Sequence, residues 1–155
     1  MNKLQLFALA LVLTLTTGCF SSGMLGKTDG GPSLTGSLEL NGATFGQASL
    51  QPTLCTSGER EVFLGADFAN PASPLVARLV VDPLGGPGVR IFDREKRYEK
   101  AIVLRREDCA TFHFSLDQTG WRINDIYQLK VHLELDCQLA SGDSVKGSLD
   151  ASSCV

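Results

Sequence analysis

Few side chains in this sequence are suited to catalysis or metal binding. Its two histidines, His113 and His132, each alternate with apolar residues, in the period-two pattern that is typical of β-strands. If the two strands are neighbours, His113, His132 and Glu134 converge on one face as metal ligands, or as a base and its orienting carboxylate. The alternative is a pair of solvated strand histidines, and we favour it.

Other catalytic motifs are missing from the sequence. There is no Gly-x-Ser-x-Gly elbow to present a nucleophilic serine. The glycines at 85–88 are followed by neither Lys-Ser/Thr nor a helix start, so they predict a turn and not a phosphate cradle. We therefore expect a protein that is not an enzyme and has no cofactor and no metal site.

The first 18 residues have the pattern of a signal peptide. Lys3 precedes an apolar run from Leu4 to Thr16, and the small residues Thr17 and Gly18 follow it. A run of about a dozen residues is too short to span a hydrocarbon core, which needs about 20. We expect a removable leader and not a transmembrane helix.

The segment Leu15-Thr16-Thr17-Gly18-Cys19 resembles the lipobox of bacterial lipoproteins. The resemblance implies that Cys19 is acylated, with diacylglycerol and palmitate, and becomes the mature N-terminus. It also implies a membrane partner through this lipid, and Phe20, in place of an inner-membrane-retaining Asp, favours the outer membrane. The alternative is an ordinary secretory signal cut elsewhere, with Cys19 in a disulfide.

Cysteine arithmetic supports the lipid assignment. Five cysteines are an odd number, and assigning Cys19 to lipid leaves an even set that can pair in an oxidising compartment: Cys55, Cys109, Cys137 and Cys154. Three pairings are open. We prefer Cys137 with Cys154, because Cys154 ends the strand after that of Cys137, which leaves Cys55 with Cys109. Zinc binding is disfavoured, since no Cys-x-x-Cys is present.

The chain from 34 to 155 shows repeated short blocks of period-two alternation with turns between them. The clearest block is 128–139, and others cover 34–40, 62–68, 75–82, 89–93, 101–105, 111–116 and 145–151. Asn41-Gly42 predicts a first hairpin. The expected fold is all-β, an antiparallel β-sandwich or small barrel of about eight or nine strands, stapled by disulfides. The expected organisation is a leader at 1–18, a flexible Gly/Ser-rich tether at 19–33 and a β-sandwich domain at 34–155.

Charge is uneven along the chain. The formal net charge is −3, which argues against a nucleic-acid binder. Residues 90–106 nevertheless hold seven bases and three acids, so their net charge is +4. The candidate partner-binding residues in this segment are Arg90, Arg94, Lys96, Arg97, Tyr98, Lys100, Arg105 and Arg106. They could dock an anionic envelope component or protein, and the alternative is a solvated hairpin with local ion pairs.

The sequence thus predicts a monomeric, membrane-anchored envelope lipoprotein that acts as a non-catalytic binding or structural module. Two alternatives stay open, a small periplasmic metal-assisted hydrolase and an inhibitor or assembly accessory. Trp121, the single tryptophan, lies in an expected loop at 118–122. We expect it to fold back over the sheet edge and not to stand exposed as an anchor for a partner.

Overall fold

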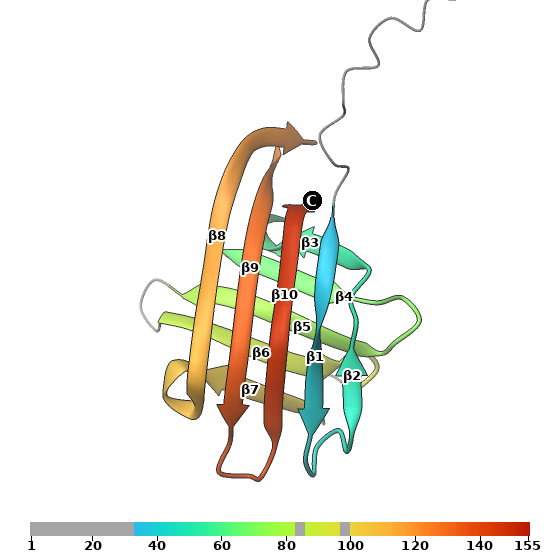
Figure 1. Cartoon of the computed structure of the whole chain (residues 1–155). Coiled ribbons are helices and arrows are strands. Elements are labelled where there is room, and N and C mark those ends of the chain that lie inside the picture. The colour runs from blue at the N-terminus through green and yellow to red at the C-terminus, as the bar shows by residue number, and fades with distance from the viewer. Residues whose placement is uncertain (1–32, 83–85, 97–99) are drawn as a thin grey trace, which may run out of the picture.

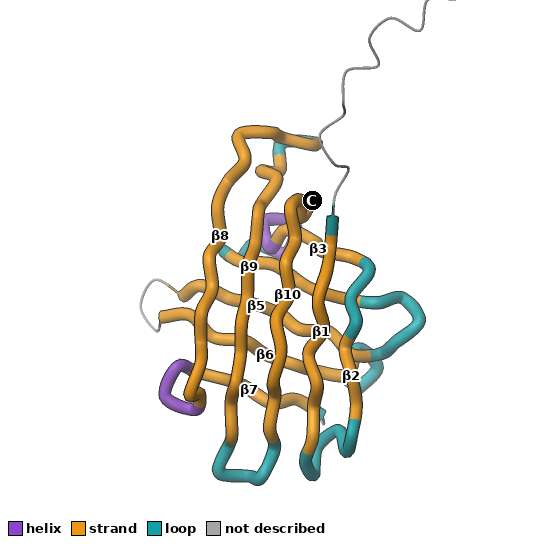
Figure 2. The backbone as a smooth tube through the Cα atoms, viewed as in Figure 1, coloured by secondary structure: helices purple, strands orange, loops and turns teal. Residues whose placement is uncertain are grey.

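The structure is a computed structural model that describes residues 33–82, 86–96 and 100–155 (Figure 1). The predicted leader, the tether up to residue 32, Cys19, Arg97 and Tyr98 lie outside the described residues. Within them, nearly all of the regular structure is strand, with two short 3-10 helices (Figure 2).

In the described part of the chain, ten strands form two antiparallel sheets of five strands each. The first, the terminal sheet, has the order β2 (Ala48–Leu50), β1 (Leu34–Asn41), β10 (Ser144–Cys154), β9 (Ile126–Gln138) and β8 (Cys109–Ile123). The second, the middle sheet, has the order β3 (Leu54–Ser57), β4 (Gly65–Ala69), β5 (Leu75–Asp82), β6 (Gly86–Asp93) and β7 (Ala101–Arg105). The helices are η1 (Gly58–Glu61) and η2 (Arg106–Asp108).

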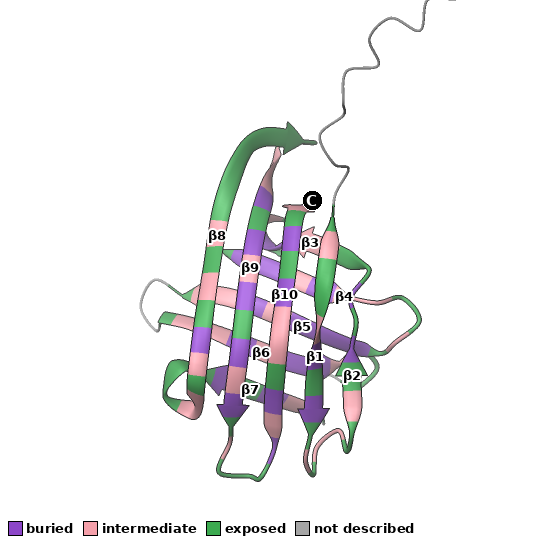
Figure 3. Cartoon of the chain, viewed as in Figure 1, coloured by how far each residue is buried: buried purple, intermediate pink, exposed green. Residues whose placement is uncertain are grey.

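The two sheets pack face to face, and their strands cross at a steep angle (Figure 1). The core between them is formed by the inward-facing residues of both sheets. On β9 the alternation is complete, because Leu129, Val131, Leu133, Leu135 and Cys137 are all at most 2% exposed. Figure 3 shows the resulting bands of buried and exposed residues along this strand. The predicted disulfide-stapled β-sandwich is confirmed.

Strand number and some boundaries differ from the expectation. The four-residue β3 has too little alternation to be recognised from sequence. The strand expected to begin at Val62 begins at Gly65 instead. The Ser57 hydroxyl accepts a hydrogen bond from the Glu59 amide and starts η1, which Val62 ends with a φ of 62°. The local alternation at 62–64 is therefore overridden by a capped turn.

The first hairpin is also longer than Asn41-Gly42 predicts. β1 and β2 pair, but the connection between them runs over residues 42–47. Asp143, from the β9–β10 turn, holds this connection: its carboxylate accepts hydrogen bonds from the Thr44 amide and the Thr44 hydroxyl, both at 2.9 Å. A contact over 99 residues therefore replaces the local two-residue turn.

The preferred disulfide pairing is wrong. The structure joins Cys55 to Cys154 and Cys109 to Cys137. β9 and β10 form an antiparallel hairpin in which Cys137 lies opposite Val145, near the turn, whereas Cys154 lies opposite Leu129 at the far end. Cysteines at opposite ends of a hairpin cannot bond, and Cys109 on β8 lies directly opposite Cys137.

Candidate functional site

The histidine hypothesis concerns the outer face of the terminal sheet. β8 and β9 are neighbours, as that hypothesis requires, with His113 opposite Glu134 and Ser115 opposite His132. The ring of His132 is engaged by a third strand, since its Nδ1 lies 2.6 Å from Asp150 Oδ1 on β10. Among the described residues, no group of three or more His, Cys, Asp or Glu side chains is arranged to hold a metal ion.

Charges on this face pair across the strands. Lys146 on β10 lies opposite Asp136 on β9, and its Nζ is 2.6 Å from Asp136 Oδ2. This hydrogen bond raises the pKa of Lys146. On the outer face of the terminal sheet, Lys146 and His132 are therefore each engaged by an acidic side chain of the neighbouring strand.

The fold gives the basic residues of segment 90–106 different surroundings. Arg94 donates hydrogen bonds to the carbonyls of Asn70 and Ser73, at 2.9 and 2.7 Å, and so holds the β4–β5 turn. Arg106 donates to the Phe112 carbonyl at 3.0 Å. These two guanidinium groups have structural partners, whereas Lys96 and Lys100 are exposed beside the β6–β7 connection.

Arg90 and Arg105 come together on the outer face of the middle sheet. They flank a shallow groove of about 200 Å³ whose remaining lining is Val80, Asp82, Gly86, Pro87, Gly88, Val89 and Val103. Gly88 lies in register with both Val80 on β5 and Arg105 on β7, so it forms the floor between two walls. A Cβ atom at Gly88 would make only ordinary contacts, so a larger residue would fit there and its side chain would occupy the groove. Glycine at this position leaves the groove open.

Arg78 lies at the centre of the same face and is saturated by carboxylates. Its Nε and Nη2 donate to the two oxygens of Asp67 at 2.8 and 2.6 Å, and Nη2 also bonds Glu61. The hydrogen bond with Asp67, followed by that with Glu61, raises the pKa of Arg78 above its usual value despite partial burial. The guanidinium also lies 4.5 Å from the centre of the Phe63 ring. Arg78 therefore organises this face but adds no net positive charge to it.

Trp121 is a second exposed feature, and its place in the fold differs from the expected one. β8 does not end near Leu116 but continues to Ile123, so Trp121 lies in a strand and is 75% exposed. The expectation that it folds back over the sheet edge is wrong. The sequence signal for this longer hairpin was Asn124-Asp125 between two isoleucines. Asn124 and Asp125 adopt positive φ angles of 52° and 64°, as the central residues of a type I′ hairpin turn do.

The fold and these two surfaces define the chain as an antiparallel β-sandwich stapled by two disulfides. In comparisons with protein-family models, curated proteins and solved structures, no significant match was found. Over the described ranges, no helix has the length and apolar character needed to cross a membrane.

Proposed function

We propose that this chain is an outer-membrane lipoprotein, anchored through acylated Cys19, whose β-sandwich is a non-catalytic binding module for an anionic partner. The anchor is supported by the lipobox resemblance at Leu15–Cys19. It is also supported by the other four cysteines, since all of them are paired with one another in two disulfides and none needs Cys19. Disulfides of this kind are typical of the periplasm and cell surface.

The observation that supports anion binding is the groove between Arg90 and Arg105. Its lining is partly aliphatic, with Val80 opposite Gly88 on one side and Val103 opposite Arg90 on the other. A guanidinium binds phosphate or carboxylate through paired N–H donors. A fitting partner therefore carries an acidic group next to an apolar portion. Arg105, opposite Gly88, and Arg90, opposite Val103, are the cationic side chains that can bind the acidic group.

The docking proposal is tested with Arg105, which is exposed on β7. The full-length protein, solubilised in detergent, is used to capture partners from an envelope extract beside the variants Arg105→Ser and Arg60→Ser. Arg60 is the matched control, because it is an exposed arginine on η1, outside the groove. We expect Arg105→Ser to bind the captured partner about tenfold more weakly, as loss of one charge-assisted hydrogen bond does.

Salt provides a second reading of the same experiment. Raised ionic strength should weaken capture by the wild type and by Arg60→Ser, because an exposed guanidinium is screened. A partner that the Arg105→Ser variant retains as well as the control does would refute docking in the groove. Arg94 is not used, since its loss would disturb the β4–β5 turn and not only the binding face.

The anchor is tested by its own chemistry. Cells that make the wild-type protein should incorporate radiolabelled palmitate into it, and the Cys19→Ser variant should incorporate none. Equal labelling of the two proteins, or no label in the wild type, would contradict the lipoprotein assignment without affecting the groove.

A further inference from the structure

The two longest strands extend past the sandwich as a hairpin. β10 ends opposite Leu129, but β8 and β9 continue as far as the turn at Asn124-Asp125. We call residues 118–128 the projecting hairpin. Figure 1 shows it bending over the end of the sandwich, and Figure 3 shows that its β8 side is exposed throughout.

The projecting hairpin exposes apolar side chains. Trp121 is 75% and Ile123 is 45% exposed. Because they are two residues apart in a strand, they point to the same side. Arg122, between them, points to the other side of the hairpin, where it lies opposite Tyr127 with its guanidinium 4.1 Å from the centre of the tyrosine ring. Tryptophan, tyrosine and arginine together are the side chains that favour a membrane–water interface.

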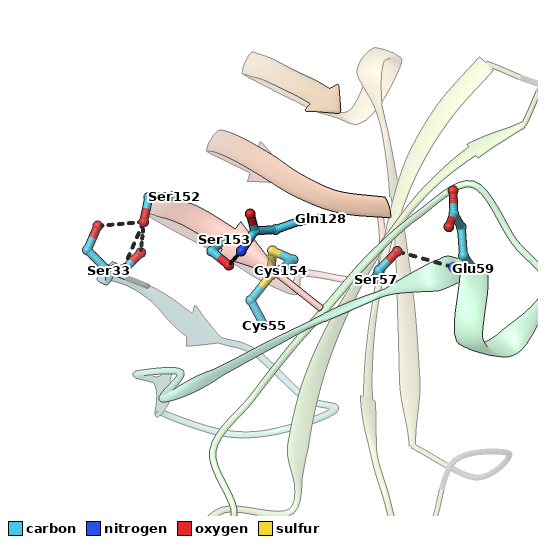
Figure 4. Close-up of a disulfide and its surroundings, with 8 residues drawn as sticks. All are labelled: Ser33, Cys55, Ser57, Glu59, Gln128, Ser152, Ser153 and Cys154. Atoms are coloured by element: carbon cyan, nitrogen blue, oxygen red, sulfur yellow. Dashed lines mark hydrogen bonds between the residues drawn. A yellow bond between two sulfur atoms is a disulfide. The ribbon is translucent and has the colours of Figure 1, made fainter. Parts of the chain in front are cut away.

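The hairpin lies at the end of the domain where the chain arrives from Cys19. Ser33, the first described residue, donates its amide hydrogen to the Ser152 hydroxyl at 2.8 Å. The next residue, Ser153, hydrogen-bonds Gln128 at the base of the hairpin. Figure 4 shows these four side chains around the Cys55–Cys154 disulfide. The entry of the chain and the base of the hairpin are thus adjacent.

The distance to the lipid is limited by the chain. Cys19 and Ser33 are 33 minus 19, or 14, residues apart. Even a fully extended chain of that length spans at most about 50 Å. If Cys19 is in a membrane, the end of the domain that carries the projecting hairpin is the end that is attached to it.

We infer that the projecting hairpin is a membrane contact, which places Trp121 and Ile123 in the headgroup region of the bilayer that holds the acylated Cys19. This inference rests on the anchor in the proposed function. Lipid and hairpin then form two points of attachment, which limits the orientation of the domain. At the tip of the hairpin Arg122 pairs with Tyr127 and Ile123 with Ile126, whereas the register is irregular between Gln118 and Arg122. A position in the headgroup region suits this backbone, because unpaired groups are costly only in the hydrocarbon core. Asp125 at the turn keeps the contact shallow, since a carboxylate is costly in the hydrocarbon core.

The test uses Trp121 as a probe, because it is the single tryptophan of the chain. Full-length lipidated protein is reconstituted into vesicles of phosphatidylethanolamine and phosphatidylglycerol, with or without bromine on the acyl-chain carbons nearest the headgroup. Bromine quenches tryptophan only at short range. We expect the brominated lipid to lower the emission about twofold, as for an aromatic ring at headgroup level.

Two variants make the result specific. In Trp121→Phe combined with Gln47→Trp, the probe moves to the β1–β2 connection, at the opposite end of the terminal sheet (Figure 1), and its emission should be unaffected by bromine. Ile123→Asp keeps Trp121 but places a charge beside it, and should reduce the quenching. Both should keep the unfolding midpoint of the wild type, because positions 47 and 123 are exposed.

The outcomes separate this inference from the proposed function. If the protein is lipidated but brominated lipid does not change the emission of Trp121, the hairpin does not contact the membrane, and the proposed anchor is unaffected. An emission change that depends on protein concentration and not on lipid overturns the hairpin contact too, and indicates pairing with a second copy. If the mass of the N-terminal peptide shows no lipid, the anchor fails, and quenching of this protein by added vesicles then decides the hairpin contact by itself.

Discussion

Cys55 and Cys154 are 99 residues apart in the chain, and their disulfide joins β3 of the middle sheet to β10 of the terminal sheet. The other disulfide, between Cys109 and Cys137, spans 28 residues and joins two neighbouring strands of one sheet. The first disulfide therefore links the two layers of the sandwich, and the second reinforces a hairpin that hydrogen bonds already hold.

The two disulfides should differ in their effect on stability. Removing a disulfide increases the conformational entropy of the unfolded chain. The increase grows with the logarithm of the number of residues in the loop that the disulfide closes. By this relation, Cys55→Ala/Cys154→Ala should lower the free energy of unfolding by about 5 kcal/mol and Cys109→Ala/Cys137→Ala by about 3.5 kcal/mol. Urea unfolding followed by circular dichroism measures both. A larger loss from the shorter loop would contradict the prediction.

Stability should fall at acid pH because of Asp143, which is 3% exposed. The hydrogen bond from the Thr44 amide, with further ones from Ser141 and Thr44 hydroxyls, lowers the pKa of this carboxyl below its usual value. A lowered pKa in the folded state means that the stabilisation is complete above the unfolded pKa, about 3.9, and is lost as the pH falls through the lower folded value.

The measurement for Asp143 is the free energy of unfolding from about pH 5 down to about pH 2, across the unfolded pKa of an aspartate. The control is Asp143→Asn, which keeps an acceptor for the Thr44 amide but does not titrate. The difference in stability between wild type and variant should shrink as the pH decreases. A difference that stays constant over this range would show that Asp143 has the same pKa in the folded and the unfolded protein, which contradicts the prediction.

The Arg78 cluster should show strong coupling between its charges. Arg78→Met leaves the carboxylate of Asp67, whose side chain is only 17% exposed, without its guanidinium partner. We expect a loss of about 2 kcal/mol, below the range for a fully buried pair. Asp67→Asn in the same chain removes the unpaired charge, so the double variant should be more stable than the sum of the single losses by about 1 kcal/mol. Simple additivity in this double-mutant cycle would show that the cluster contributes little.

Two glycines provide a matched test of strand packing. Gly147 has a φ of 140°, and a Cβ atom there would lie 2.1 Å from the Ser37 carbonyl oxygen on β1. Gly46 has a φ of 69°, with open space around the Cβ position. Gly147→Ala should therefore cost about 3 kcal/mol or more of stability, and Gly46→Ala about 1 kcal/mol, the cost of backbone strain alone. Similar unfolding midpoints for the two variants would contradict the close approach of β1 and β10.

Much of the fold could be predicted because side-chain alternation is a local property. The boundaries of β5 and β7 agree with the expected strands at 75–82 and 101–105, and the pattern at 128–139 corresponds to β9. Alternation failed at Val62, where a capped turn determines the backbone, and it missed β3, which is too short to show a period. Exposed residues of β8 beyond Leu116 lack alternation because neither side of the projecting hairpin is buried.

Less of the candidate site could be predicted. The sequence marks residues 90–106 as basic, but it cannot separate Arg94 and Arg106, which bond carbonyls from other parts of the chain, from Arg90 and Arg105, which flank the groove. That separation depends on β5, β6 and β7 lying side by side, so it is a property of strand pairing and not of composition.

By itself, the sequence determined the all-β class, the inward face of each long strand and the even set of domain cysteines, because hydrophobic burial acts on each strand through its own period of two. Tertiary structure alone decided which cysteines pair, that Asp143 holds a turn 99 residues away, and that the base of the hairpin carrying Trp121 lies near Ser33. The physical reason is register: hydrogen bonding between distant strands sets which residues are opposite each other, and no local pattern encodes that choice.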